Sequence, residues 1–306
     1  MTDTMTRTAT VLAVDLGKTS CRVRLSTDGE VVTEAHGIGA PGLADAHGAR
    51  LSFEAIADAV DQLDADLPAG VPIGIGAAGS EAAPAAAHAL IGLLRERFAG
   101  PIAIINDALA AHAGAFAGAP GTMLIAGTGA VVFAVDDKRR IGQVDGWGPW
   151  LGDEGSGQWI GRHGLMAAVR AHDRRGQHTV LLALATDLTG DISTLPHWVS
   201  ETGAPARQLG TFAPTVLDAA NSGDAVAVEI VEHAAAHLAD TCAAAGLENV
   251  CVAGGLAAHP FLAARIAAAL EAHGLRQVEP AGDALTGAHL VAIDRTLPYE
   301  ERILRG

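Results

Sequence analysis

A short polar loop near the start of the chain has the residue types that bind phosphate groups. Residues 15–19, Asp-Leu-Gly-Lys-Thr, follow an apolar, β-branched stretch and precede an alternating one, so we predict a turn between two strands. A carboxylate, an ammonium and a hydroxyl on one turn suit phosphate and Mg²⁺. The last three residues match the end of a P-loop, but Leu12 replaces its first glycine and no helix follows. A P-loop is therefore excluded, and a plain hairpin turn remains the alternative.

Asn106 and Asp107 stand where a buried apolar strand, residues 101–105, gives way to a helical pattern. Side chains at such a junction point from the sheet edge toward a ligand site. Asp107 is therefore a candidate general base, and the helix N-terminus would keep its carboxylate ionised at neutral pH. The alternative is that both residues only cap the helix.

Two further turns are rich in glycine and follow predicted strands. Residues 126–130, Ala-Gly-Thr-Gly-Ala, would let backbone N–H groups and the Thr128 hydroxyl approach a phosphate. Gly254 and Gly255 end the strand predicted at residues 249–253. Either pair of glycines could instead form an ordinary turn.

The most unusual segment is the glycine-rich stretch from Gly146 to Gly157. It combines closely spaced glycines with Trp147, Trp150 and the carboxylates of Asp153 and Glu154. Large aromatic side chains beside so many small residues are typical of a loop that wraps a polar ligand.

Two competing motifs suggest other chemistry. Gly74, Gly76 and Gly79 match a dinucleotide-binding GxGxxG pattern, although Asp107 follows later than the usual ~20 residues. His233 and His237, with Asp240 one turn on, lie on one face of a predicted helix and have zinc-ligand spacing. In a chain with 13 histidines such a pair is more simply a solvated helix face.

The elements that would position these residues alternate in a regular way. Three antiparallel strands (10–14, 21–25, 31–34) are followed by helices from 52 and over 81–98 and 107–116, with strands at 71–75 and 101–105 between them. A strand–glycine turn–strand unit recurs at 122–135, with a strand at 141–144, and mostly helical sequence follows to about 246. Helices begin near 259 and 283, and residues 300–302 are predicted as a solvated tail. The recurrence predicts an α/β protein with two similar halves around a cleft.

Composition excludes several classes of protein. The 306 residues carry 20 Lys and Arg against 35 Asp and Glu, a net charge of −15, so nucleic-acid binding is not expected. No apolar run reaches the ~20 residues that a membrane span needs, and no signal peptide is visible. Three cysteines without CxxC spacing predict reduced, buried thiols and a cytoplasmic protein.

Taken in order, the motifs at 15–19, 107, 127–129, 146–157 and 254–255 resemble the BadF/BadG/BcrA/BcrD ATPase family, in its N-acetylglucosamine and glucosamine kinase branch. The resemblance implies a duplicated ribonuclease-H-like, actin/hexokinase-type fold, with two domains at 1–117 and 118–287 around an ATP cleft. A C-terminal helix at about 288–306 would pack back on the first domain. It further implies an ATP- and Mg²⁺-dependent kinase that makes an amino sugar 6-phosphate, and a homodimer.

The resemblance also assigns roles by position. Asp107 would be the base and Asp15 would hold Mg²⁺. The implied phosphate-binding residues are Asp15, Gly17, Lys18, Thr19, Thr128 and Gly129. The implied sugar-binding residues are Asn106, Asp107, Gly146, Trp147 and Asp153, with Gly254 and Gly255 at the adenosine.

The chain departs from the family pattern in two places. Lys18 stands where the family usually has glycine, and neither the loop at 37–42 nor Ala78 offers the polar side chain that would recognise an N-acetyl group. Two other functions of the same fold stay open. One is an activator ATPase of radical dehydratases with a cysteine-bound iron–sulfur cluster, and the other is a non-catalytic sugar sensor.

Overall fold

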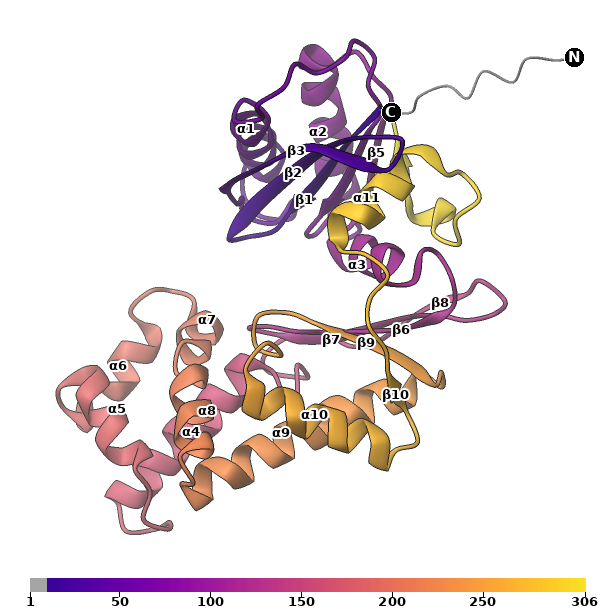
Figure 1. The fold of residues 1–306 in the computed structure, drawn as a ribbon. Coiled ribbons are helices and arrows are strands. Elements are labelled where there is room, and N and C mark those ends of the chain that lie inside the picture. The colour runs from indigo at the N-terminus through magenta and orange to yellow at the C-terminus, as the bar shows by residue number, and fades with distance from the viewer. Residues whose placement is uncertain (1–9) are drawn as a thin grey trace, which may run out of the picture. The chain divides into compact units, whose positions relative to one another are not determined.

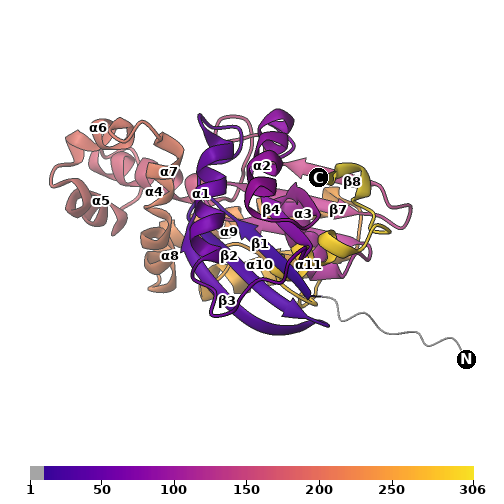
Figure 2. The same cartoon turned by 90° about the horizontal axis from the view of Figure 1, so that it is seen from above.

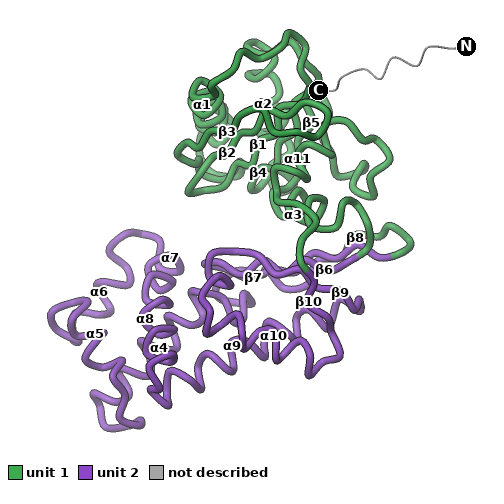
Figure 3. The backbone as a smooth tube through the Cα atoms, in the orientation of Figure 1, with its two compact units in different colours: residues 1–120, 137–141, 279–306 green, residues 121–136, 142–278 purple. Residues whose placement is uncertain are grey.

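The computed structural model describes residues 10–306, which form two compact units (Figure 3). Unit 1 contains residues up to Pro120, Asp137–Ile141 and Glu279–Gly306, and unit 2 contains Gly121–Asp136 and Gly142–Val278. Residues 1–9, over which no signal peptide was expected, lie outside the described part. Among residues 10–306, no helix is both long enough and apolar enough to cross a bilayer.

The sheet of unit 1 begins with the predicted antiparallel strands, which curve together in Figure 2. Its order is β11-β5-β4-β1-β2-β3, in which β1, β4 and β5 are parallel. The strands are β1 (Thr10–Leu16), β2 (Ser20–Thr27), β3 (Glu30–Ile38), β4 (Ile73–Ala77), β5 (Ile102–Asn106) and β11 (Leu304–Arg305). The side chains of β4 are buried along its whole length, as expected of a central parallel strand.

Helices cover both faces of this sheet. α1 (Gly48–Val60) and α2 (Pro84–Arg97) pack together on one face, and α3 (Asp107–Phe116) packs with α11 (Ala284–Ile293) on the other (Figure 1). The predicted first residues of α1 and α2 are wrong. α1 begins at Gly48 rather than Ser52, after His47 in the left-handed region. α2 begins at Pro84 rather than Glu81, because proline favours the first helical turn.

The C-terminal segment differs from the prediction. Residues 300–302 form a 3₁₀ turn, η2 (Glu300–Arg302), rather than a free tail, although Glu301 and Arg302 are exposed to solvent as predicted. The helix expected over 288–306 ends at Ile293, and Leu304 pairs with Ile104 of β5. The Tyr299 side chain is fully buried, and its hydroxyl lies 2.6 Å from His112 Nδ1. Burial of this side chain and strand pairing hold the segment on the sheet.

Unit 2 contains the second strand–turn–strand start. Its sheet has the order β10-β9-β6-β7-β8, with β6 antiparallel to β7 and parallel to β9. The strands are β6 (Gly121–Ala126), β7 (Ala130–Val135), β8 (Ile141–Asp145), β9 (Asn249–Ala253) and β10 (Arg276–Gln277). The two-residue strands β10 and β11 were not predicted, because segments so short carry no periodic signal.

The rest of unit 2 is helical, as the sequence indicates. The long helix α9 packs against α4, α8 and α10 and contributes alanine-rich faces to one apolar core. The helices are α4 (Gly157–His172), α5 (Leu181–Thr189), α6 (Leu195–Ser200), α7 (Pro205–Gly210), α8 (Ala213–Asn221), α9 (Ala225–Ala244) and α10 (Pro260–Ala272), with the 3₁₀ turn η1 (Ile192–Thr194).

Candidate active site

In unit 1, the predicted acidic residues gather at one edge of the sheet. Asp15 is the penultimate residue of β1. Asn106 is the last residue of β5, Asp107 follows it, and β4 lies between the two strands. The register aligns Asp15 with Gly76, and an added Cβ at Gly76 would lie 3.5 Å from Cα of Asp107. The carboxyl ends of the parallel strands therefore bring Asp15 and Asp107 to the same side of the sheet.

Asp107 is the first residue of α3 and is largely enclosed. The Ala108 N–H donates to both Asn106 Oδ1 and Asp107 Oδ1, each at 2.9 Å. Burial raises the pKa of Asp107, and Asp15 adds to the rise, whereas the Ala108 hydrogen bond and Lys18 act in the opposite direction. Its position at a helix N-terminus was expected to lower the pKa of Asp107, but the effect of burial is larger and the pKa is raised. A raised pKa makes the carboxylate a stronger base.

The Asn106 side chain is used for helix capping, the simpler of its two predicted roles. Its Oδ1 accepts the Ala108 N–H. The cap uses the amide oxygen, so the amide nitrogen is the group of Asn106 that can donate to a ligand.

Asp15 belongs to a chain of charges that the sequence did not predict. Arg22 on β2 donates to Asp15 Oδ2 from Nε at 3.1 Å and from Nη2 at 2.7 Å, and it reaches Asp283 Oδ2 at 3.3 Å. Arg24, two residues along the same strand face, donates to both oxygens of Asp283 at 2.9 Å and also pairs with Glu34. These contacts fix the orientation of the Asp15 carboxylate.

The loop at 15–19 is supported by the segment after β3. The Ala40 N–H donates to the Gly17 oxygen at 3.2 Å, and Leu43 N–H donates to the Ala78 oxygen at 2.9 Å. Lys18 is exposed, and its Cε lies 3.6 Å from the Cβ position of Gly42. The structure therefore places the loop at 37–42 and Ala78, both discussed for sugar specificity, beside Lys18.

In unit 2, the glycine turns also meet at one sheet edge. β6 and β9 run parallel with Ile125 aligned to Ala253, so the turns that follow them are neighbours. Gly254 has φ +104°, and a Cβ there would overlap the carbonyl oxygen of Ala126. This turn therefore requires glycine, whereas a Cβ at Gly255 would meet no atom within 4 Å.

The turn around Thr128 is anchored to the start of α4. Gly157 N–H donates to the Gly127 oxygen at 2.8 Å, and Gln158 N–H donates to the Thr128 oxygen at 3.0 Å. Thr128 itself is exposed. Its hydroxyl and the neighbouring backbone are thus presented on a fixed turn, as binding of phosphate requires.

The glycine-rich loop is closed by two carboxylates. Asp153 is buried, and its Oδ1 accepts the Gly148 N–H at 3.2 Å. Burial raises the pKa of Asp153, and the nearby Asp145 raises it further. A Cβ on Gly129 would come within 2.5 Å of Asp153 Oδ2, so this loop lies directly against the turn around Thr128.

Asp145, at the end of β8, holds the glycine-rich loop in place and was missed by sequence reasoning. It has φ +60°, and its Oδ1 and Oδ2 accept the N–H groups of Asp153 at 2.9 Å and Glu154 at 3.1 Å. Its carboxylate joins the two ends of the loop. The only sequence signal is an acidic residue directly before Gly146.

The apolar side chains of this loop point outward. Trp147 is 74%, Trp150 69% and Leu151 84% exposed. Such exposure of large apolar groups is typical of a ligand-contacting surface.

Neither competing motif forms its site. Gly74 and Gly76 lie within β4, where a Cβ on Gly74 would overlap the Ala288 oxygen, so these glycines allow helices to pack on the sheet. Asp240 pairs with His273 Nε2 at 2.8 Å, and His237 lies 3.8 Å from Glu154. Over residues 10–306, no group of three or more His, Cys, Asp or Glu could hold a metal ion.

The single carboxylate of Asp15 still fits a Mg²⁺ ion that binds together with a nucleotide. Mg²⁺ usually takes one or two carboxylates, several waters and the substrate phosphates. Arg22 contacts only Oδ2 of Asp15, which leaves Oδ1 as the oxygen that would face such an ion.

Comparison with known proteins gives the family. Residues 12–292 match the BadF/BadG/BcrA/BcrD ATPase family. The chain belongs to this family. The fold agrees with the duplicated architecture that the resemblance predicted, since each unit starts with the same strand–turn–strand arrangement.

Two curated proteins with assigned activities are similar to this chain. The glucosamine kinase GspK of Vibrio cholerae is 30% identical over 260 residues, 80% of this chain and 84% of that protein. The N-acetylmuramic acid/N-acetylglucosamine kinase of Clostridium acetobutylicum is 32% identical over 143 residues, 46% of this chain and 47% of that protein. The chain thus matches most of the former and about half of the latter.

Solved structures show the same fold. A Chromobacterium violaceum protein assigned as an N-acetylglucosamine kinase has a TM-score of 0.77 and 26% identity, covering 93% of this chain and 99% of that chain. A ROK family glucokinase of Streptomyces griseus, solved with glucose and AMPPNP, has a TM-score of 0.57 and 18% identity over 93% of this chain and 99% of that chain. The family member described here therefore has the two-domain, ribonuclease-H-like architecture of hexokinase-type kinases.

Proposed function

We propose that the protein is an ATP-dependent kinase that transfers a phosphoryl group to the 6-hydroxyl of an amino sugar, N-acetylglucosamine or glucosamine. The observation that carries the proposal is the enclosed Asp107 carboxylate at the strand-end edge beside Asp15, with a raised pKa. The glucosamine kinase that is similar over most of the chain supports the choice of substrate.

Asp107 would accept the proton of the sugar hydroxyl as the phosphoryl group is transferred. Phosphoryl transfer depends chiefly on alignment and on neutralising charge. The Ala108 hydrogen bond fixes one oxygen of Asp107, so the other is presented to the hydroxyl. Lys18, whose charge reaches Asp107, would add a positive charge at the transferred phosphate.

The remaining residues would bind and orient the two substrates. We assign Gly17, Thr19, Thr128 and Gly129 to the phosphates, and Gly254 and Gly255 to the adenosine. Asn106, Gly146, Trp147 and Asp153 would line the sugar. When bound with ATP, Mg²⁺ would neutralise phosphate charge, held by Asp15.

The proposal includes the wider properties that the family resemblance implies. We place the protein in the cytoplasm as a homodimer, with domains at 1–117 and 118–287. Its net charge of −15 argues against nucleic acid as a partner.

The test is an ADP-release assay with Mg·ATP against glucosamine, N-acetylglucosamine, N-acetylmannosamine, N-acetylmuramic acid, glucose and a blank without sugar. We expect turnover with glucosamine or N-acetylglucosamine that exceeds the blank at least tenfold. ADP release that does not depend on sugar would contradict the proposal and favour an activator ATPase. Absence of release with every sugar would favour a sensor.

The activator function is less well supported by the cysteines. Cys21, Cys242 and Cys251 are all buried, on three different elements. Burial raises the pKa of both Cys21 and Cys242 to about 12, so neither is a ready thiolate ligand.

A further inference from the structure

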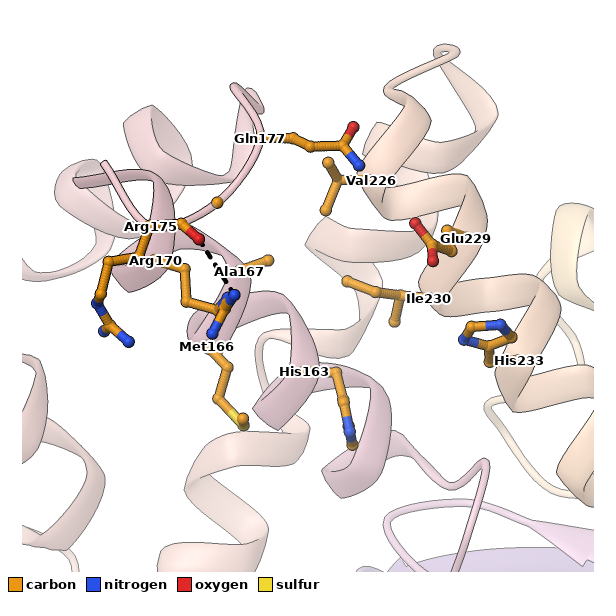
Figure 4. A pocket seen from close by; sticks show the side chains of 11 residues that line it. His163, Met166, Ala167, Arg170, Arg175, Gln177, Val226, Glu229, Ile230 and His233 are labelled. Atoms are coloured by element: carbon orange, nitrogen blue, oxygen red, sulfur yellow. Dashed lines mark hydrogen bonds between the residues drawn. The ribbon is translucent and has the colours of Figure 1, made fainter. Parts of the chain in front are cut away.

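A pocket lies in unit 2, between helices α4 and α9. Its volume is about 560 Å³, within the range of small-molecule sites. Figure 4 shows Arg170 reaching in from α4, with Glu229 and His233 on α9 opposite. Met166, Ala167 and Ile230 add an apolar surface between them. None of these residues has a role in the proposed kinase reaction.

The rim of this α4–α9 pocket is a structured loop. Arg175 N–H and Gly176 N–H both donate to the Arg170 oxygen, at 2.8 and 3.1 Å, and Arg170 Nη2 donates back to the Arg175 oxygen at 3.1 Å. At the other end, Thr179 Oγ1 and Val180 N–H each lie 2.9 Å from a carboxylate oxygen of Asp224, the N-cap of α9. The loop is therefore fixed to both helices, and these hydrogen bonds define the shape of the cavity rim.

The charges of Arg170 and Glu229 are not neutralised within the described part of the chain, although Arg170 Nη2 also donates to the rim loop. Among residues 10–306, no carboxylate forms an ion pair with Arg170 and no cation pairs with Glu229. The guanidinium offers several N–H donors in a planar array that suits phosphate or carboxylate. Glu229, on the facing helix, offers the opposite charge, which suits a protonated amine.

His163 adds a hydrogen-bond acceptor. Its ring stacks on Trp159 with centroids 3.7 Å apart, and its Nδ1 lies 2.8 Å from the Trp159 oxygen. A carbonyl only accepts, so Nδ1 carries the proton. Burial lowers the pKa of His163, with Arg162 and two neighbouring histidines contributing. The neutral ring therefore presents Nε2 as an acceptor for a hydroxyl or amine.

We propose that the α4–α9 pocket binds a small amphoteric molecule, with its phosphate or carboxylate at Arg170 and its protonated amine at Glu229. A phosphorylated amino sugar and a free α-amino acid share this chemistry. The proposal goes beyond the kinase reaction and does not depend on which sugar is phosphorylated. Because α4 begins at the turn around Thr128, an occupant of the pocket would contact the same helix that anchors that turn.

The test is hydrogen–deuterium exchange of the full chain, with millimolar glucosamine 6-phosphate or serine as separate probes. At ten times its dissociation constant, a ligand slows exchange that requires local opening by about tenfold. We expect slowing in residues 173–180 and at the start of α9 with at least one probe. Exchange in peptides from the loop at 146–157 reports binding at the active site separately. Because turnover is not measured, this test can fail while the kinase assay succeeds.

Variants separate the pocket from nonspecific binding. Arg170→Gln and Glu229→Gln should each abolish the slowing in residues 173–180. Arg174→Gln, an exposed neighbour that does not line the cavity, should keep it. The proposal is overturned if neither probe slows exchange there, or if Arg170→Gln retains the effect. Equal slowing by glucose 6-phosphate, which lacks the amine, would overturn the role of Glu229.

Discussion

The strand-end edges of the two units differ in the kind of group they present. The edge of unit 1 carries side-chain charges: Asp15 held by Arg22, the enclosed Asp107, and the exposed Lys18. The edge of unit 2 carries backbone turns, shaped by Gly254 and Gly129 and closed by carboxylates that accept only backbone N–H groups. In the proposed reaction, the same strand–turn–strand start would support acid–base chemistry in unit 1 and backbone contacts with the nucleotide in unit 2.

This contrast teaches how each half should respond to substitution. Unit 1 should be sensitive to the loss of a charge at constant shape. Unit 2 should be sensitive to the addition of a single carbon atom, even where no functional group is removed.

Replacing Asp107 should give the largest effect. General base catalysis contributes about 10²–10⁴-fold, so Asp107→Asn should lower kcat by that factor while ATP binding, measured by calorimetry, is retained. Asp58→Asn, an exposed acid on α1, is the matched control. Turnover of the Asn variant within tenfold of the parent would remove Asp107 as the base.

An added methyl group should separate two neighbouring glycines in unit 2. In Gly254→Ala, the side chain would overlap the Ala126 oxygen at a positive φ, and such strain costs about 1–3 kcal/mol. We expect the KM for ATP to rise by about 5- to 160-fold. Gly255→Ala should leave it unchanged, because the space there is open. Equal KM values for the two variants would contradict the assigned role of this turn.

Opening the glycine-rich loop should have a smaller effect. Asp145→Ala removes the acceptor of two backbone N–H groups, which we expect to cost about 1–2 kcal/mol. The sugar KM should rise about tenfold with little change in kcat, and fluorescence of Trp147 and Trp150 should report a looser loop. Asp187→Ala, an exposed acid on α5, is the control. A fall in kcat at constant KM would show that Asp145 acts otherwise.

The smallest effect concerns pH. Asp107 must be ionised to act, so kcat/KM falls as pH decreases through its pKa, which burial has raised. Lys18 opposes that rise, so Lys18→Ala should move the acid limb to higher pH, by about half a unit for an exposed charge, and less in high salt. Arg95→Ala on α2 should leave the limb in place. A shift of the acid limb to lower pH would contradict the effect of Lys18 on the pKa of Asp107.

The sequence predicted most of the elements that present the site. The apolar strands, the helix from Asp107 and the strand at 249–253 follow from local patterns, and parallel pairing then places their ends together. The Arg22–Asp283 contact was not predictable, because it joins residues 261 positions apart through tertiary packing. The hydrogen bonds from the loop backbone to Asp145 were missed for a different reason, since an acidic residue before glycine is equally typical of any turn.

The route of the chain sets an order of assembly during synthesis. Residues 279–306, which supply α11, Tyr299 and the edge strand β11 to unit 1, are translated after all of unit 2. A nascent chain can therefore fold its second unit while the first still lacks one covering helix and one strand. Until residues 279–306 leave the ribosome, the free edge of β5 and the uncovered face of α3 are open to pairing with other chains, and completion of the sheet ends that exposure.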